Sequence, residues 1–287
     1  MAEIVKHYRN NEALRGSFNR LAEATFGLNF KNWYQNGFWG DDYDPYSIWE
    51  DGKIVANVSV NRTFMRIGGE EKRLYQLGTV MTDEAYRNRG YIRRIMEEVE
   101  KDIGDADGVY LFANDSVLDF YPKFGFTNGT EHIYSKAVRQ DGPCRMKNIP
   151  MDGPTAWKLL EEAAKASTFP AACQMTDPRG LLFFYVSQFM QDCVYHDAET
   201  DTWVVAEKED GSLLIHNVFS SREITLDQVI SAFGSTVNQV TLGFTPEDTT
   251  GFDCQVLQEE DTTFFVKGDI FRDFAEKNLR IPTLAHA

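Results

Sequence analysis

Residues 76–96 decide the fold, and they read Gln-Leu-Gly-Thr-Val-Met-Thr-Asp-Glu-Ala-Tyr-Arg-Asn-Arg-Gly-Tyr-Ile-Arg-Arg-Ile-Met. The first seven residues predict the end of a strand at Thr82, and the apolar spacing after Gly90 predicts a helix over 92–103. A strand, a short loop and a helix bring unpaired backbone N–H groups and the positive end of a helix dipole to one point. Such a point binds phosphate, and a glycine there lets an anion approach the backbone closely. The stretch is therefore either a phosphate site or an ordinary helix start.

Four arginines, Arg87, Arg89, Arg93 and Arg94, stand within this stretch of a strongly acidic chain. The 287 residues hold 29 basic and 44 acidic side chains, which give a net charge of −15. Residues 1–140 contribute −3 of this charge (21 acidic, 18 basic) and residues 141–287 contribute −12 (23 acidic, 11 basic). Such a surface repels nucleic acid, whereas a basic cluster within it indicates a bound anion. The acidity itself is either a charge that favours solubility or a wall that collects a cationic substrate.

The predicted elements on both sides of this stretch form a mixed α/β layer. In the first half, strands are predicted at 4–8, 46–50, 53–67, 72–82 and 108–113, with a strand pair in 126–138, and helices at 11–25, 30–38, 92–103 and 116–124. In the second half, helices are predicted at 155–166, 179–191 and 226–233, and strands at 202–207, 212–219, 239–244 and within 252–266. The second half repeats the order of the first in shortened form. We therefore expect a duplicated fold with a diverged second copy, divided into residues 1–140 and 141–287.

A second motif follows the arginine stretch at a fixed distance. Asn114 ends the next predicted strand, Tyr121 comes seven residues later in the pair Phe-Tyr, and Gly-Phe follows at 125–126. Together with Arg87-x-x-Gly90, these motifs resemble the GNAT superfamily of acetyl-CoA-dependent N-acetyltransferases. The resemblance covers about residues 2–138 and implies a GNAT fold.

One position departs from the usual motif of this superfamily. Ile92 stands where the phosphate loop normally carries Gly or Ala. The stretch is similar to the tandem-GNAT branch related to the enhanced-intracellular-survival acetyltransferases, which carries Ile or Leu there and still binds acetyl-CoA. That branch has a second, degenerate GNAT copy, in agreement with the expected duplication.

The resemblance implies direct transfer of an acetyl group from acetyl-CoA to a primary amine. The backbone of the cofactor strand would hold the pantetheine arm, and the Val80 N–H would polarise the thioester carbonyl. Tyr121 would protonate the leaving thiolate, or it only packs beneath the sheet. Asn114 would bond the pantetheine or order a water, and no general base is evident. The implied cofactor-binding residues are Val80, Met81, Thr82, Arg87, Asn88, Arg89, Gly90, Tyr91, Ile92, Arg93 and Asn114.

The acceptor site is predicted from the loop between the first two strands, which borders the acceptor in this fold. The loop carries aromatic rings and carboxylates close together, and these suit a small cationic amine. Alternatively, it is a solvated acidic loop that caps aromatic core residues. The candidate substrate-binding residues are Trp33, Trp39, Asp41, Asp42 and Asp44.

The second copy lacks the phosphate loop. After the predicted strand at 212–219 the chain reads Ser-Ser-Arg-Glu-Ile-Thr-Leu, without an Arg-x-x-Gly motif. We interpret this copy as structural, with a second role as one wall of the acceptor pocket.

Other features narrow the class of protein. The chain has no run of 18 apolar residues and no secretory signal, so we expect a cytoplasmic protein without a membrane partner. Its four cysteines are predicted to be reduced, and no spacing indicates a metal site. The sequence leaves a homo-oligomer open. Two functions remain: an N-acetyltransferase for a small cationic amine, favoured by Arg87, Gly90 and Tyr121, or a non-catalytic acyl-CoA-binding or regulatory module.

Overall fold

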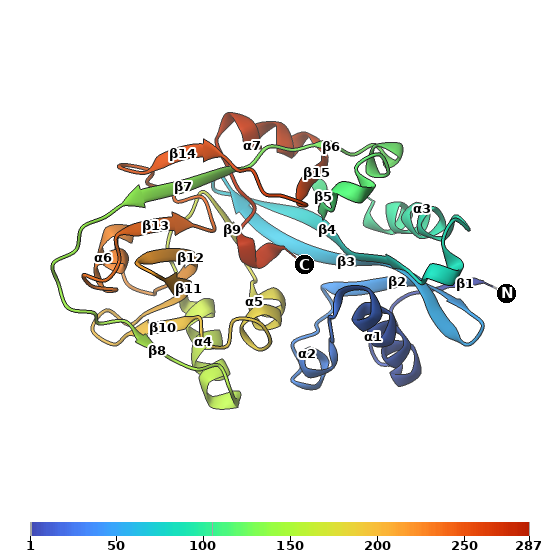
Figure 1. The fold of residues 1–287 in the computed structure, drawn as a ribbon, viewed down its shortest axis with the longest axis horizontal. Coiled ribbons are helices and arrows are strands. Elements are labelled where there is room, and N and C mark those ends of the chain that lie inside the picture. The colour runs from blue at the N-terminus through green and yellow to red at the C-terminus, as the bar shows by residue number, and fades with distance from the viewer. Residues whose placement is uncertain (1, 105, 287) are drawn as a thin grey trace.

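The computed structural model describes residues 2–104 and 106–286 as a mixed α/β structure with two sheets (Figure 1). The first sheet has the strand order β1-β2-β3-β4-β5-β15-β6, and β9 extends it by pairing with β3. The second sheet has the order β14-β7-β13-β12-β11-β10-β8. The predicted α/β fold with a mixed sheet in each of two copies is confirmed.

The first half follows the predicted element order closely. Its strands are β1 (Glu3–Val5), β2 (Tyr43–Glu50), β3 (Lys53–Ile67), β4 (Glu70–Thr82), β5 (Gly108–Ala113), β6 (Thr127–Asn128) and β7 (His132–Ala137). Its helices are α1 (Glu12–Phe26), α2 (Lys31–Gln35) and α3 (Tyr91–Ile103). The helix predicted at 116–124 is wrong: two 3₁₀ turns, η2 (Asp115–Val117) and η3 (Tyr121–Phe124), stand there. Pro122 lacks the N–H that a continuous helix would need at this point.

The first helix lies on the opposite side of the sheet from α3 (Figure 1). It begins where Asn11 accepts a hydrogen bond from the Leu14 N–H, and it ends at Gly27, which adopts the left-handed conformation. Its buried face includes Phe18 and Leu21. α3 packs its own stripe of Ile95, Met96 and Val99 into the core on the other face.

The second half contributes the remaining elements. Its strands are β8 (Lys147–Asn148), β9 (Cys173–Met175), β10 (Val194–Asp197), β11 (Thr202–Glu209), β12 (Ser212–Phe219), β13 (Gln239–Leu242), β14 (Asp253–Val256) and β15 (Thr263–Lys267). Its helices are α4 (Pro154–Ala166), α5 (Arg179–Val186), α6 (Leu226–Ser231) and α7 (Arg272–Glu276), with 3₁₀ turns η4 (Asp269–Phe271) and η5 (Thr283–Ala285). β12 and β13 are parallel with α6 between them, as β4 and β5 are parallel with α3 between them.

The two sheets exchange strands. β15 lies between β5 and β6 in the first sheet, and β7 lies between β13 and β14 in the second. The strands within 126–138 therefore do not pair with each other, which corrects that part of the expectation. The division at residue 140 stays a prediction. The first sheet includes β15, which comes after residue 140, and the second sheet includes β7, which comes before it.

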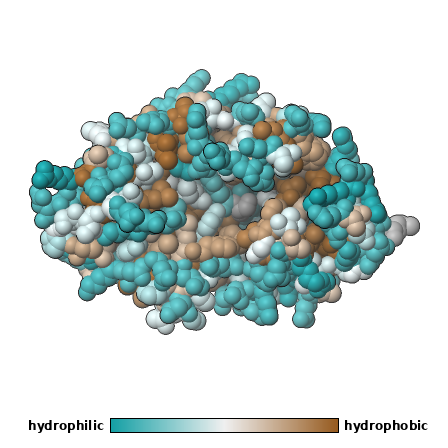
Figure 2. Space-filling model, in the orientation of Figure 1, coloured by the Kyte–Doolittle hydropathy of each residue, from teal (hydrophilic) through white to brown (hydrophobic). Residues whose placement is uncertain are grey.

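Both halves also share one core. Phe38 stacks on Phe183 with ring centroids 4.2 Å apart, and the Trp33 indole N–H donates to the Gly180 carbonyl at 2.8 Å. These contacts join the segment after α1 to α5. The surface is hollowed near the middle of the molecule, and hydrophobic atoms lie along part of the edge of this hollow (Figure 2).

Candidate active site

The site opens where two parallel strands separate. β4 and β5 pair over only three positions, Leu74–Gln76 with Gly108–Tyr110, although β4 continues to Thr82 and β5 to Ala113. A cavity of about 890 Å³ lies along the separated ends, lined by residues 76–82 on one side and 112–114 on the other. Cavities of this volume are typical of small-molecule and cofactor sites.

An irregularity in β4 fixes the backbone along this cavity. The register of β3 against β4 shifts between Asn57 and Ser59, and Thr79 adopts a left-handed φ of 48°. The Asn57 side chain donates to the Thr79 carbonyl at 2.9 Å. Because a bulge leaves backbone groups outside the strand ladder, Thr79 and Val80 can present such groups to the cavity that they line.

The N-terminus of α3 forms one end of the cavity. Its N-cap, Gly90, is left-handed with φ 73°, and no side chain caps the helix there. A Cβ added to Gly90 would meet no atom within 4 Å, so open space lies in front of this helix end. Arg87, Asn88 and Ile92 line the cavity beside it. α3 has 13 residues, and its uncapped start with a neighbouring arginine fits a phosphate group.

The arginines of the cluster make different contacts, and only one of Arg87, Arg89 and Arg93 lines the cavity. Arg87 lines the cavity, with its side chain 58% exposed. The Arg89 guanidinium instead lies over the Tyr86 ring at 4.6 Å and donates to the Ala85 carbonyl. The Arg93 guanidinium lies 5.8 Å from the centre of the Phe124 ring.

Four of the predicted cofactor residues do not line the cavity. Tyr91, one of them, donates its hydroxyl proton to Glu50. The four are Arg89, Gly90, Tyr91 and Arg93. Those that do line the cavity are Val80, Met81, Thr82, Arg87, Asn88, Ile92 and Asn114.

Tyr121 lines the cavity from η3 and is buried. Its ring packs against Phe126 at 6.2 Å and against Phe265 of β15 at 5.6 Å. Burial raises the pKa of the Tyr121 hydroxyl to about 12, so the group keeps its proton at neutral pH. The side chain thus packs against these rings and lines the cavity, and its role as a proton donor stays a prediction.

Asn114 is held in place by the second half. Its side-chain amide donates to Asp261 at 3.0 Å, and the same carboxylate accepts from the Asp115 N–H at 2.7 Å. These two hydrogen bonds lower the pKa of the Asp261 carboxyl, the backbone bond contributing most. The returning loop before β15 therefore fixes the end of β5.

The predicted acceptor loop is only partly at the cavity. Trp33 lines it, but Trp39, Asp41, Asp42 and Asp44 do not. Each aspartate is paired elsewhere: Asp41 with Arg9 at 2.7 Å, Asp42 with Arg62 at 2.7 Å and Asp44 with His7 at 2.6 Å. The Trp39 indole N–H donates to the Tyr43 carbonyl. Asp41 and Asp42 are thus in local ion pairs, and Asp44 is in contact with the His7 ring.

Residues 11–129 match the family model of the acetyltransferase (GNAT) domain. This matched segment is called the GNAT domain below. A probable N-acyltransferase from Enterococcus faecalis V583 has a TM-score of 0.63 and 13% identity, covering 96% of this chain and 75% of its own. A GCN5-related N-acetyltransferase from Kribbella flavida (TM-score 0.55, 15% identity) covers 93% of this chain and 70% of its own.

Eis1 from Mycobacterium abscessus is similar in the same way, with a TM-score of 0.55 and 11% identity over 92% of this chain and 72% of its own. These similarities extend over both halves and confirm the expected two-copy GNAT fold. At such identities the likeness is one of fold. The comparison with curated proteins gave no match.

The second half supplies cavity residues that the sequence did not predict. Leu181, Phe184, Tyr185 and Phe189 reach the cavity of the GNAT domain from α5 and the turn after it. The apolar run at 179–191 was the available signal, but it predicted only a helix. His286 also lines the cavity and stacks on Phe112 at 3.8 Å, and its carbonyl accepts from the Tyr185 hydroxyl.

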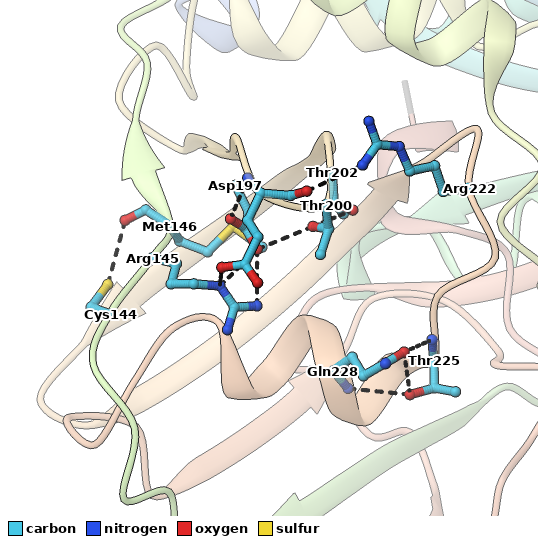
Figure 3. Close-up of polar contacts among 10 residues, drawn as sticks. Cys144, Arg145, Met146, Asp197, Thr200, Thr202, Arg222, Thr225 and Gln228 are labelled. Carbon is cyan, nitrogen blue, oxygen red and sulfur yellow. Dashed lines mark hydrogen bonds and ion pairs between the residues drawn. The ribbon is translucent and has the colours of Figure 1, made fainter.

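The corresponding point of the second copy is closed by its own side chains (Figure 3). Thr225 and Gln228 form a capping box at the start of α6, each bonding to the backbone of the other. The neighbouring Arg222 donates to the Glu199 carbonyl at 3.1 Å. This helix start is thus satisfied internally, in contrast to Gly90 of the GNAT domain.

Among residues 2–104 and 106–286, no group of three or more His, Cys, Asp or Glu side chains could hold a metal ion. Within the same ranges no helix is long and apolar enough to cross a membrane. All four cysteines are free.

Proposed function

We propose that this protein transfers an acetyl group from acetyl-CoA directly to a primary amine. The observation that carries the proposal is the separation of β4 from β5 beside the uncapped start of α3, with both along one cavity of about 890 Å³. The GNAT family match over residues 11–129 supports it.

The residues present fit acetyl-CoA in a consistent order along the cavity. Arg87 and the backbone from Asn88 to Ile92 would hold the pyrophosphate at the start of α3. The backbone of Val80, Met81 and Thr82 would hold the pantetheine arm, with Asn114 on the facing strand end. Bound acetyl-CoA supplies the acetyl group as an activated thioester.

Two groups of the chain would then act on the reaction. The Val80 N–H, at the irregular part of β4, would donate a hydrogen bond to the carbonyl oxygen. Tyr121 would give its proton to the departing sulfur, because its raised pKa keeps it protonated across the physiological range.

The acceptor would react as the free amine, and its nature is a separate question. The sequence predicted a small cation drawn in by Asp41, Asp42 and Asp44. Their ion pairs with Arg9, Arg62 and His7 do not support that role. The primary amine itself stays part of the proposal, as the group that attacks a thioester in direct transfer.

A CoA-release assay tests the proposal. Purified protein is mixed with acetyl-CoA and a panel of primary amines, the free thiol is measured, and the acetylated amine is identified by mass spectrometry. We expect amine-dependent thiol release with equal amounts of both products. CoA binding without release for any amine would instead support the non-catalytic acyl-CoA-binding module.

A further inference from the structure

The cavity has an aromatic wall on the face of the first sheet that carries α1 and α2. Four buried rings form it: Phe30, Trp33 and Tyr43 from the GNAT domain, and Phe184 from α5. Phe30 stacks on Phe184 with centroids 5.5 Å apart, and Trp33 meets the edge of Tyr43 at 5.1 Å. The wall is therefore a rigid surface built by both halves of the chain.

This wall begins at the reacting strand. The Tyr43 hydroxyl lies 3.0 Å from the Thr79 hydroxyl, at the irregular part of β4, and also donates to Ser59 at 2.8 Å. Val80, the proposed donor to the thioester carbonyl, is the next residue. A group lying on the aromatic wall would thus reach the point of acyl transfer.

The described lining of the cavity is nearly uncharged. No described residue that lines the cavity is Asp, Glu or Lys, although the chain holds 44 acidic residues. Arg87 stands at the anion end, and burial keeps His286 neutral by lowering its pKa to about 3. A polyamine would leave its further ammonium groups against uncharged rings without a counter-ion, which is unfavourable.

The rings are also poorly arranged to enclose a cation. Such recognition uses open ring faces. One face of Trp33 is covered by Trp39, stacked at 5.7 Å, and one face of Phe30 is covered by Tyr43, also at 5.7 Å. The wall therefore offers apolar area and ring edges rather than a cage.

The rim of the cavity is apolar as well. Phe26, Val117 and Phe189 line the cavity and are 44%, 38% and 54% exposed. Hydrophobic atoms lie along part of the edge of the hollow on this face of the molecule (Figure 2). Phe26 ends α1 and Phe189 follows α5, so two of the three stand on the aromatic side of the sheet. Exposed apolar side chains around a pocket indicate an apolar ligand.

We propose that the acceptor is an arylalkylamine, a primary amine whose single charged group is attached to an aromatic body that lies against Phe30, Trp33 and Phe184. This inference rests on the proposed function and names its substrate class. The acceptor is favoured over a long acyl chain of the donor because α2, which carries Trp33, lies with α1 on the opposite side of the first sheet from α3, whose start would hold the cofactor (Figure 1).

The test compares amines of similar size on the full-length protein. Binding of 2-phenylethylamine, tryptamine, putrescine and spermidine to the CoA-loaded protein is measured by calorimetry, and rates are measured with acetyl-CoA. We expect kcat/KM for the aromatic amines to exceed that for the polyamines by at least about tenfold. Burying roughly half the surface of a phenyl group strengthens binding by about this factor.

The matched variants are Phe189→Ala at the rim and Leu159→Ala on α4, where Leu159 is 47% exposed and does not line the cavity. Phe189→Ala should raise Kd and KM for tryptamine about threefold to tenfold with a smaller change in kcat. Phe189→Leu should restore most of the affinity, and Leu159→Ala should leave both constants unchanged.

The outcomes separate the two proposals. Aromatic amines that bind but are not acetylated would overturn the proposed function and leave the binding site. Acetylation with the polyamines as best substrates would overturn the arylalkylamine and leave the acyltransferase. A parallel series of acetyl-, butyryl- and octanoyl-CoA tests the donor: a strong gain with octanoyl-CoA that Phe189→Ala removes would assign the wall to the acyl chain and refute the acceptor assignment.

Discussion

Gly90→Ala is the substitution that most sharply tests the anion end of the cavity. Gly90 has φ 73° and ψ 15°, which costs an L-residue about 1–2 kcal/mol of folding free energy. The added methyl group would meet no atom of the chain within 4 Å, and it would stand at the N-cap of α3, which no side chain caps. It should therefore hinder a phosphate group more than it disturbs the folded chain.

Gly27→Ala supplies the matched control. Gly27 ends α1 with φ 69° and ψ 12°, and a Cβ there also meets nothing within 4 Å. Both variants should lower the melting temperature of the free protein by similar amounts. Only Gly90→Ala should lose stabilisation by CoA.

The size of that loss follows from mass action. At a CoA concentration of 100 Kd, binding stabilises the wild-type protein by about 2.7 kcal/mol, and a tenfold weaker Kd leaves about 1.4 kcal/mol. Differential scanning fluorimetry with and without CoA measures this difference. Equal CoA-induced shifts in the wild type, Gly90→Ala and Gly27→Ala would refute a phosphate site at α3.

Three further predictions concern other parts of the molecule. Tyr121→Phe should lower turnover about 10²–10⁴-fold and leave the CoA-induced melting shift unchanged. The control is Tyr86→Phe, because the Tyr86 hydroxyl donates to Asp51 and Tyr86 does not line the cavity; this variant should keep its turnover. Equal activity of the two variants would mean that Tyr121 only packs in the core. Burial raises the pKa of Glu131 to about 8 in the folded chain, from an ordinary value of 4.5. The folded chain therefore binds this proton more tightly than the unfolded chain. Its contribution to the free energy of unfolding is full below about pH 4.5 and is lost as the pH rises towards 8. Glu131→Gln should therefore add about 1–3 kcal/mol to the free energy of unfolding at pH 8 and much less at pH 5, and a benefit that does not change with pH in denaturant titrations would contradict this. Replacing Asp41, Asp42 and Asp44 together with Asn should leave the acceptor KM and its salt dependence unchanged, since these groups pair with Arg9, Arg62 and His7; a raised KM in steady-state assays would return them to the acceptor site.

Local patterns were sufficient for several elements of the first half. The alternation in β3 and the apolar spacing in α1 gave their bounds within a residue, because both periodicities depend on residues close in the chain. The motifs from Arg87 to Tyr121 indicated the same cavity, because their spacing in the chain fixes which strand ends they follow.

Long-range pairing could not be read in this way. Phe265 of β15 pairs with Leu111 of β5, and nothing near either residue specifies the other. Tyr121 packs on Phe265 and Asn114 bonds to Asp261, so the exchanged segment completes the site that the first half begins. Side-chain direction was equally hidden: the sequence placed Arg89 near a helix start, but its packing on Tyr86 depends on the folded loop.

The aromatic wall shows the same division. The sequence marked Trp33 as a candidate, yet its partner Phe184 comes from a run that predicted only a helix. The carboxylates close to Trp33 in the sequence turn to Arg9, Arg62 and His7 instead. Proximity in the chain therefore did not show which side chains of this loop reach the cavity.

Transfer of an isotopically labelled acetyl group is the most direct test of the central claim. The protein is incubated with acetyl-CoA labelled in the acetyl group and with tryptamine, and the amine, the free CoA and the intact protein are analysed by mass spectrometry. The account predicts one labelled acetyl group on the amine for each CoA released, no label on the protein, and a Tyr121→Phe variant that binds CoA but transfers the label far more slowly. CoA bound at α3 without label on tryptamine or any other amine would contradict it.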